Sequence, residues 1–184
     1  MLTLEVGPGT ELDGIARPCE IWADCGTVET LDGEAQNQPT YVHDLRQPIP
    51  LELYGRFDYV LASHVLEHID RNHLGIAVDN LVQACKPGGE ICILVPSLEW
   101  AAARIMEGDN GLAVQGMLWG GQREGNNWDV HYVGFTLAAL VAMAKLKGLE
   151  VKMAGQTPFE ITGGGKRWSV MSNYLLAKRL EVQR

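Results

Sequence analysis

Several features are missing from this chain of 184 residues, and each absence excludes a class of protein. No apolar run reaches membrane-spanning length, and the first residues form no charged and then apolar leader, so we expect a cytoplasmic protein with no membrane partner. The four cysteines lack CxxC spacing and stand in no cluster with histidines, which predicts no disulfide framework and no metal site. The net charge of −8 disfavours nonspecific binding to nucleic acid.

The order of the predicted elements indicates an α/β protein, and the length fits a single domain over residues 1–184. Apolar spacings of three and four predict helices at 74–85, 98–106 and 137–147. Short apolar runs predict strands at 2–6, 21–23, 40–43, 57–62, 90–95, 149–153 and 170–177. Their alternation predicts a doubly wound, seven-stranded and mostly parallel sheet, with the final pair of strands antiparallel.

Four further segments are predicted to be irregular. Residues 26–38 are polar and turn-rich, and 86–89 join a helix to a strand. Residues 108–127 are rich in glycine and asparagine, which predicts a mobile loop. The glycine run at 163–165 precedes a strand rather than a helix, so it reads as a flexible connection and not as a phosphate loop.

The first predicted strand runs directly into a pair of glycines, Gly7 and Gly9. Glycine lets the backbone turn tightly and approach a ligand where a Cβ atom would collide. The third glycine of a dinucleotide fingerprint is absent, and Glu5 would repel a pyrophosphate, so the motif argues against NAD. Taken alone, the motif is better explained as a structural turn.

Two carboxylates stand at the ends of the next two predicted strands, Asp24 after 21–23 and Asp44 after 40–43. Either one alone reads as a carboxylate that caps a turn. In an open α/β sheet, however, small ligands bind at the carboxyl ends of the strands. Two such acids after a glycine turn therefore favour a cofactor site.

Several segments carry a family resemblance through their order and spacing. They are LEVGPG at 4–9, Asp24, HDL at 43–45, FDYVLASHVLEHI at 57–69, CKPGGEICILVPS at 85–97 and HYVGFT at 131–136. Together they resemble the class I S-adenosylmethionine-dependent methyltransferases, especially the small-molecule group called the type 11 domain. The resemblance implies S-adenosylmethionine as cofactor and a Rossmann-like sheet. The helical segment that usually precedes the first strand in that family is not expected here.

The resemblance also implies how individual residues would bind the cofactor. Glu5, Gly7 and Gly9 would lie beside its methionine part. Asp24 would accept hydrogen bonds from the ribose hydroxyls. The remaining implied contacts are Asp44 with the adenine amine, the Leu45 backbone beside the adenine ring, and Ser63 near the sulfonium.

Catalytic roles are implied for His64, which follows the fourth strand, and for His131. Histidine suits proton removal from an acceptor near neutral pH. An ordered loop histidine is an equal explanation for His131. Glu67 and His68 follow a family pattern that we interpret as mainly structural.

The acceptor is narrowed by two motifs that the sequence does not contain. An Asn/Asp-Pro-Pro-aromatic element does not follow the fourth strand, and neither the fourth nor the fifth strand is followed by a Pro-Cys nucleophile. We therefore expect methylation of an oxygen or nitrogen on a small-molecule or glycan-like acceptor. Two alternatives stay open: a catalytically silent scaffold subunit, and a nicotinamide-dependent oxidoreductase. A second copy or a partner subunit could also complete the pocket.

Overall fold

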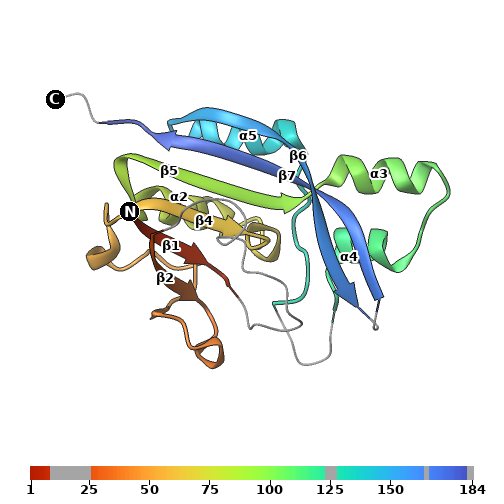
Figure 1. Ribbon diagram of the computed structural model, residues 1–184, viewed down its shortest axis with the longest axis horizontal. Coiled ribbons are helices and arrows are strands. Elements are labelled where there is room, and N and C mark those ends of the chain that lie inside the picture. The colour runs from red at the N-terminus through yellow and green to blue at the C-terminus, as the bar shows by residue number, and fades with distance from the viewer. Residues whose placement is uncertain (9–25, 123–127, 164–165, 182–184) are drawn as a thin grey trace.

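Seven strands form one sheet in the computed structural model, which describes residues 1–8, 26–122, 128–163 and 166–181 (Figure 1). The strands are β1 (Leu2–Val6), β2 (Thr27–Asp32), β3 (Tyr41–Val42), β4 (Phe57–Ser63), β5 (Cys85–Pro96), β6 (Leu149–Gly163) and β7 (Lys166–Arg179). Their order is β3-β2-β1-β4-β5-β7-β6. The five neighbouring strands β3, β2, β1, β4 and β5 pair in parallel, and β7 is antiparallel to both β5 and β6. The predicted Rossmann-like sheet is confirmed.

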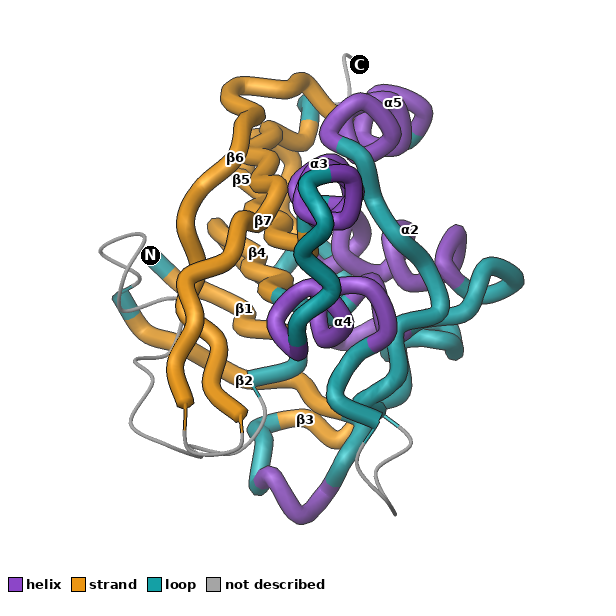
Figure 2. Tube along the Cα trace, turned by 90° about the vertical axis from the view of Figure 1, so that its right-hand side faces the viewer, coloured by secondary structure: helices purple, strands orange, loops and turns teal. Residues whose placement is uncertain are grey.

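The core lies between the sheet and the helices, which Figure 2 shows on one side of the strands. The helices are α2 (Leu74–Ala84), α3 (Leu98–Met106), α4 (Leu112–Trp119) and α5 (Leu137–Leu146). Phe57, Leu81, Ile91 and Leu140 are among the fully buried side chains of this core. Burial of each such side chain contributes about 1.5–3 kcal/mol. None of the described helices is long and apolar enough to cross a membrane.

The predicted N-termini of two helices are confirmed by their capping contacts. The Ser97 hydroxyl accepts a hydrogen bond from the Trp100 amide at 3.2 Å and caps α3. The Thr136 hydroxyl accepts from the Ala139 amide at 3.1 Å and caps α5. Capping residues of this kind satisfy amides that have no partner within the helix.

Strand β2 corrects the prediction that residues 26–38 are only turns. It pairs in parallel with β1 from Thr27 to Leu31. Only its last two residues are buried, which explains why its sequence shows no apolar run. Its Thr27, Val28 and Thr30 are residue types that favour strands, so β2 follows local β-propensity without an apolar run. The strand predicted at 21–23 lies outside the described residues.

Three other predicted boundaries are wrong. Helix α4 occupies part of 108–127, which was expected to be a loop. Strand β5 already begins at Cys85, so it includes the predicted turn at 86–89. Strands β6 and β7 pair continuously out to Gly163 and Lys166 instead of being joined by a long connection. The far end of this hairpin is stabilised by contacts of Phe159, Ile161, Trp168 and Val170 with α3 and α4.

A buried asparagine on α2 holds the chain that follows β3. The Asn80 amide donates to the carbonyls of Leu45 and Gln47, at 2.9 and 2.7 Å, and its oxygen accepts from the Ile49 amide at 2.9 Å. The Asn80 side chain is 1% exposed. These three bonds fix Leu45 in place.

Replacing Asn80 with alanine should lower the free energy of unfolding by about 3 kcal/mol, because buried backbone groups lose their partners. Urea denaturation measures this change. The adjacent Asp79→Ala variant is the control: it removes only an exposed ion pair with Lys147, 2.7 Å long, and should cost less than about 1 kcal/mol. Equal losses in the two variants would contradict the role of Asn80.

Candidate functional site

A cavity of about 1470 Å³ opens at the carboxyl ends of β1, β2 and β4. Gly7 and Asp32 line one end of it, beside these strands. The other end is lined by His131, by Met117 of α4, and by Phe159 and Trp168 of the hairpin. The position agrees with the general rule that ligands bind beyond the carboxyl ends of parallel strands.

The turn after β1 requires glycine at position 7. Gly7 has φ +64°, and its amide donates to the Leu31 carbonyl at 2.8 Å. A Cβ atom here would lie 2.6 Å from Cγ2 of Val65. Glu5, two residues earlier in β1, is 2% exposed. The predicted Gly9 lies outside the described residues.

The acidic residue at the end of the second strand of the sheet is Asp32. Its carboxylate accepts from the Glu34 amide at 2.8 Å and from the Asn37 side chain at 3.0 Å, and it lines the cavity. Asp24, which follows the strand predicted at 21–23, lies outside the described residues. The sequence feature that could have identified Asp32 as the end of a strand is the acid followed by a glycine, Asp32-Gly33.

Asp44 is engaged by a neighbouring arginine. The Arg46 guanidinium donates to both Asp44 carboxylate oxygens, at 2.7–3.0 Å, and it lies over the Trp128 ring at 4.7 Å. Hydrogen bonding from Arg46 holds the pKa of the Asp44 carboxyl below its usual value. Leu45 and His43, on either side of Asp44, line the cavity. The predicted contact of Asp44 with adenine stays a prediction.

The chain bends sharply after β4, at His64. This residue has φ 55°, a conformation that costs energy for any side chain other than glycine. Its Nδ1 lies 3.3 Å from Glu67 Oε1, its Nε2 lies 3.0 Å from the Ser172 hydroxyl, and its ring stacks on Phe159 at 4.1 Å. Both ring nitrogens of His64 are therefore engaged. The buried hydroxyl of Ser63 makes no hydrogen bond to the described residues.

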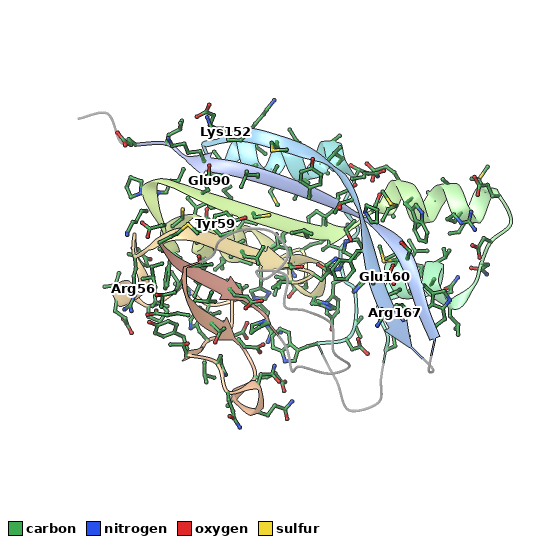
Figure 3. All side chains as sticks on the ribbon, viewed as in Figure 1. Arg56, Tyr59, Glu90, Lys152, Glu160 and Arg167 are labelled. Atoms are coloured by element: carbon green, nitrogen blue, oxygen red, sulfur yellow. The ribbon has the colours of Figure 1, made fainter. Side chains whose placement is uncertain are left out.

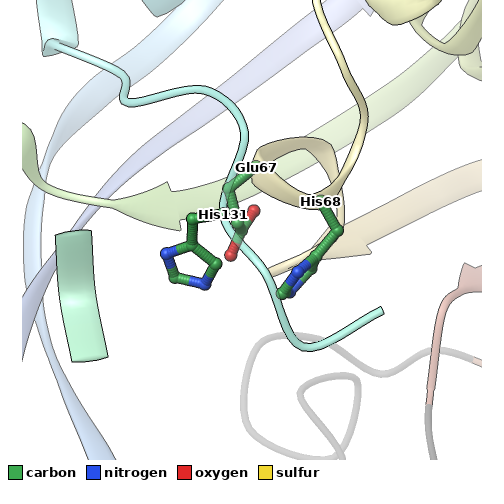
Figure 4. A group of neighbouring side chains, drawn as sticks. All are labelled: Glu67, His68 and His131. Carbon is green, nitrogen blue, oxygen red and sulfur yellow. The ribbon is translucent and has the colours of Figure 1, made fainter. Parts of the chain in front are cut away.

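Glu67, His68 and His131 come together beside this bend (Figure 4). Glu67 and His68 belong to a short 3-10 helix, η3 (Leu66–His68). The Glu67 carbonyl accepts from the amides of Tyr132 and Val133, at 2.8 and 3.3 Å, which fixes the segment that carries His131. The sequence pattern around Glu67 and His68 predicts a mainly structural role for them and gives no signal for their contact with His131.

Burial and charge act against each other in this cluster. Burial raises the pKa of the Glu67 carboxyl, but the hydrogen bond and charge of His64, with smaller effects of His68 and His131, leave that pKa below its usual value. Burial lowers the pKa of His131, and Glu67 offsets this only in part. The cluster thus favours an anionic Glu67 beside a neutral His131.

Comparisons with known proteins place the chain in a family. A family model described as a methyltransferase domain matches residues 3–152. A S-adenosylmethionine-dependent methyltransferase from Methanosarcina mazei has a TM-score of 0.64 at 14% identity, over 98% of this chain and 92% of that chain. The N-methyltransferase NodS from Bradyrhizobium japonicum, solved with S-adenosylhomocysteine, has a TM-score of 0.57 at 13% identity, over 98% and 78% of the two chains. A comparison with curated proteins finds no match.

The chain belongs to this methyltransferase-domain family, since the model covers most of its length. It is a class I S-adenosylmethionine-dependent methyltransferase, and the predicted class and cofactor are confirmed. At identities of 13% and 14%, the two solved structures show only that the fold is shared.

Gly7→Ala should lower the free energy of unfolding by about 2 kcal/mol or more, through backbone strain and contact with Val65. In a Val65→Ala background the loss should shrink, because the colliding methyl group is gone. Thermal and urea unfolding of the two single variants and the double variant measure the coupling. Strictly additive losses would show that the two positions do not touch.

Proposed function

We propose that this methyltransferase transfers its methyl group to an oxygen or nitrogen of a small-molecule or glycan-like acceptor. The observation that carries the proposal is the continuity of the cavity, which reaches from Gly7 and Asp32 to His131 and Trp168. A cavity of about 1470 Å³ exceeds the roughly 300–1,000 Å³ of an ordinary ligand pocket, so it has room for cofactor and acceptor together.

The cofactor end of the cavity would be formed by Glu5, Gly7, Asp32 and Leu45. Gly7 leaves its backbone open to a ligand because it has no Cβ atom. The Asp32 carboxylate is the acceptor for the ribose hydroxyls in this proposal, in the position that the sequence analysis gave to Asp24. The fit is supported by the burial of Asp32, which is 8% exposed and lines the cavity one residue beyond its last pairing with β1.

The acceptor end has an aromatic lining. Trp119, Phe159 and Trp168 line the cavity there, and Phe159 is held against His64. Flat apolar faces of this kind suit a sugar ring or a planar metabolite. Figure 3 shows Glu160 and Arg167 near the end of the hairpin, where their side chains lie 4.0 Å apart. The two charges offset each other, which does not favour an acceptor with a large net charge.

Within this site the protein mainly positions the reactants. S-adenosylmethionine, when bound, supplies a methyl group that its sulfonium activates for displacement. The chain's own residues orient the acceptor and exclude water, and alignment alone lowers such a barrier by several kcal/mol, up to about 7–11. His131 is our candidate for the residue that contacts the acceptor, with His64 beside it at the bend after β4.

Asp32→Ala should weaken S-adenosylmethionine binding by about 10–100-fold, because a hydrogen bond to a charged group contributes about 1.5–3 kcal/mol. Calorimetric titration with S-adenosylmethionine and S-adenosylhomocysteine measures the change. Asp24→Ala is the matched comparison and should bind the cofactor like the unmodified protein. The reverse pattern would return the ribose contact to Asp24.

His131→Ala should lower kcat by at least about tenfold while leaving the cofactor Kd within a factor of two or so. Steady-state methyl transfer to a panel of hydroxyl and amine acceptors gives kcat, and calorimetry gives Kd. Unmodified kinetics in this variant would make His131 a structural loop residue. Cofactor binding by the unmodified protein without transfer to any acceptor would favour the scaffold alternative.

A further inference from the structure

We propose that Glu67, His68 and His131 form a binding site for a divalent transition-metal ion, with Zn²⁺ as the ion that best matches the donor set. One donor atom from each residue lies within 4.8 Å of the other two (Figure 4). Two imidazoles and a glutamate, with further positions left open, are a donor set that catalytic zinc ions use. The prediction of no metal site rests on the cysteines and on their spacing to histidines, and not on these three residues.

Backbone hydrogen bonds fix the tautomer of both imidazole rings. Nδ1 of His68 lies 3.1 Å from the Val130 carbonyl oxygen, and Nδ1 of His131 lies 3.1 Å from the Met117 carbonyl oxygen. A carbonyl oxygen can only accept, so each Nδ1 donates a hydrogen bond and each Nε2 is the ring nitrogen that can face a metal ion. Metal-binding histidines almost always donate their other ring N–H in this way. Both rings are therefore already prepared as ligands.

The Glu67 carboxylate is the third donor, and its surroundings leave its charge poorly balanced. The side chain is 1% exposed, and the His64 ring is its close polar contact in the described part of the chain. His64 Nδ1 lies 3.3 Å from Oε1, and Oε2 makes no hydrogen bond there. A carboxylate taken out of water without hydrogen bonds is strongly unfavourable unless a positive charge compensates it. A divalent ion between Glu67 and the two imidazoles supplies that charge.

The spacing of the donors requires only a small closure around an ion. Tetrahedral zinc with bonds of about 2.0–2.1 Å holds its donor atoms about 3.3 Å apart. The widest pair, at most 4.8 Å apart, must therefore draw together. Rotation of the three side chains can supply this movement, and the Glu67 carboxylate would exchange its contact with His64 Nδ1 for the ion. The backbone needs no change, since the Glu67 carbonyl already ties η3 to Tyr132 and Val133.

The position of the cluster gives the ion a role in recognition of the acceptor. Glu67, His68 and His131 all line the cavity that also contains the proposed cofactor end. Coordination positions that the protein leaves open would face this cavity and bind an oxygen or nitrogen of the acceptor. This role rests on the proposed function, whereas binding of the ion does not. The acceptor class is thereby narrowed to molecules with a heteroatom that can coordinate a metal.

Calorimetric titration with ZnCl₂ tests the site on untagged protein that has been treated with EDTA and desalted. We expect one ion per chain, and an affinity that Glu67→Gln and His131→Ala each lower by more than about tenfold, since even a lost supporting contact costs that much. His73→Ala is the matched control and should bind zinc normally, because His73 pairs with Asp70 at 2.7 Å on the surface. Co²⁺ gives an independent readout, through a visible absorption band that Glu67→Gln should weaken.

The proposal is overturned if the unmodified protein binds no stoichiometric zinc, or if Glu67→Gln binds it unchanged. Circular dichroism of each variant identifies loss of fold, and His68→Ala then replaces a variant that unfolds. S-adenosylmethionine titration before and after EDTA treatment separates this proposal from the proposed function. Cofactor binding and methyl transfer that persist without any zinc binding would reject the metal site and leave the proposed function intact. Zinc binding without transfer to any acceptor would support the site and count against the proposed function.

Discussion

The bend at the end of β4 is the constraint on which the rest of the site depends. His64 adopts φ 55° there, and its amide is held by the Leu94 carbonyl of β5 at 2.9 Å. This bend starts the chain toward η3, where the Glu67 carbonyl binds two amides of the distant 130–133 segment. Strain at a single residue of this kind persists only where the surrounding structure holds it. The residues of β4 and β5 next to the bend, Ala62 and Leu94, are fully buried, so the bend is fixed by the centre of the sheet.

The two ends of the cavity are lined by different parts of the chain. The proposed cofactor end is built from the carboxyl ends of parallel strands, which the βαβ topology brings together in any sheet of this class. The proposed acceptor end is lined by α4, by His131 and by the β6–β7 hairpin. Helix α4 packs on the hairpin through side chains, and the His131 ring contacts the Met117 carbonyl of α4. Variation in this second group can alter the acceptor without disturbing the first. This separation agrees with a fold that many methyltransferases share and a substrate that fold alone does not specify.

The sheet could be predicted from the sequence because its central strands consist of recognisable apolar runs. Most of β4 and the second half of β5 are buried and read as nearly continuous apolar runs, whereas β2 has only two buried residues and reads as polar turns. Because β2 lies at 27–32, the acid at its carboxyl end is Asp32, and the predicted ribose contact of Asp24 is proposed for Asp32 instead. Helix α4 was missed for a related reason: glycines flank it, and its stability comes from packing on α3 and the hairpin.

The Glu67–His68–His131 cluster shows which part of a site a single sequence leaves hidden. His64 and His131 were both singled out, yet the residue that connects them, Glu67, read as part of a structural pattern. Its importance depends on two facts that local spacing cannot supply: its complete burial, and the close contact of its carboxylate with the His64 ring. A long-range backbone contact, from Tyr132 to Glu67, then brings His131 to a residue 64 positions earlier in the chain. Because an uncompensated buried carboxylate is costly, the group that balances Glu67 decides the chemistry of the acceptor end. A proton shared with His64 would make that end an acid–base site, and a metal ion held with His68 and His131 would make it a site for coordination of the acceptor.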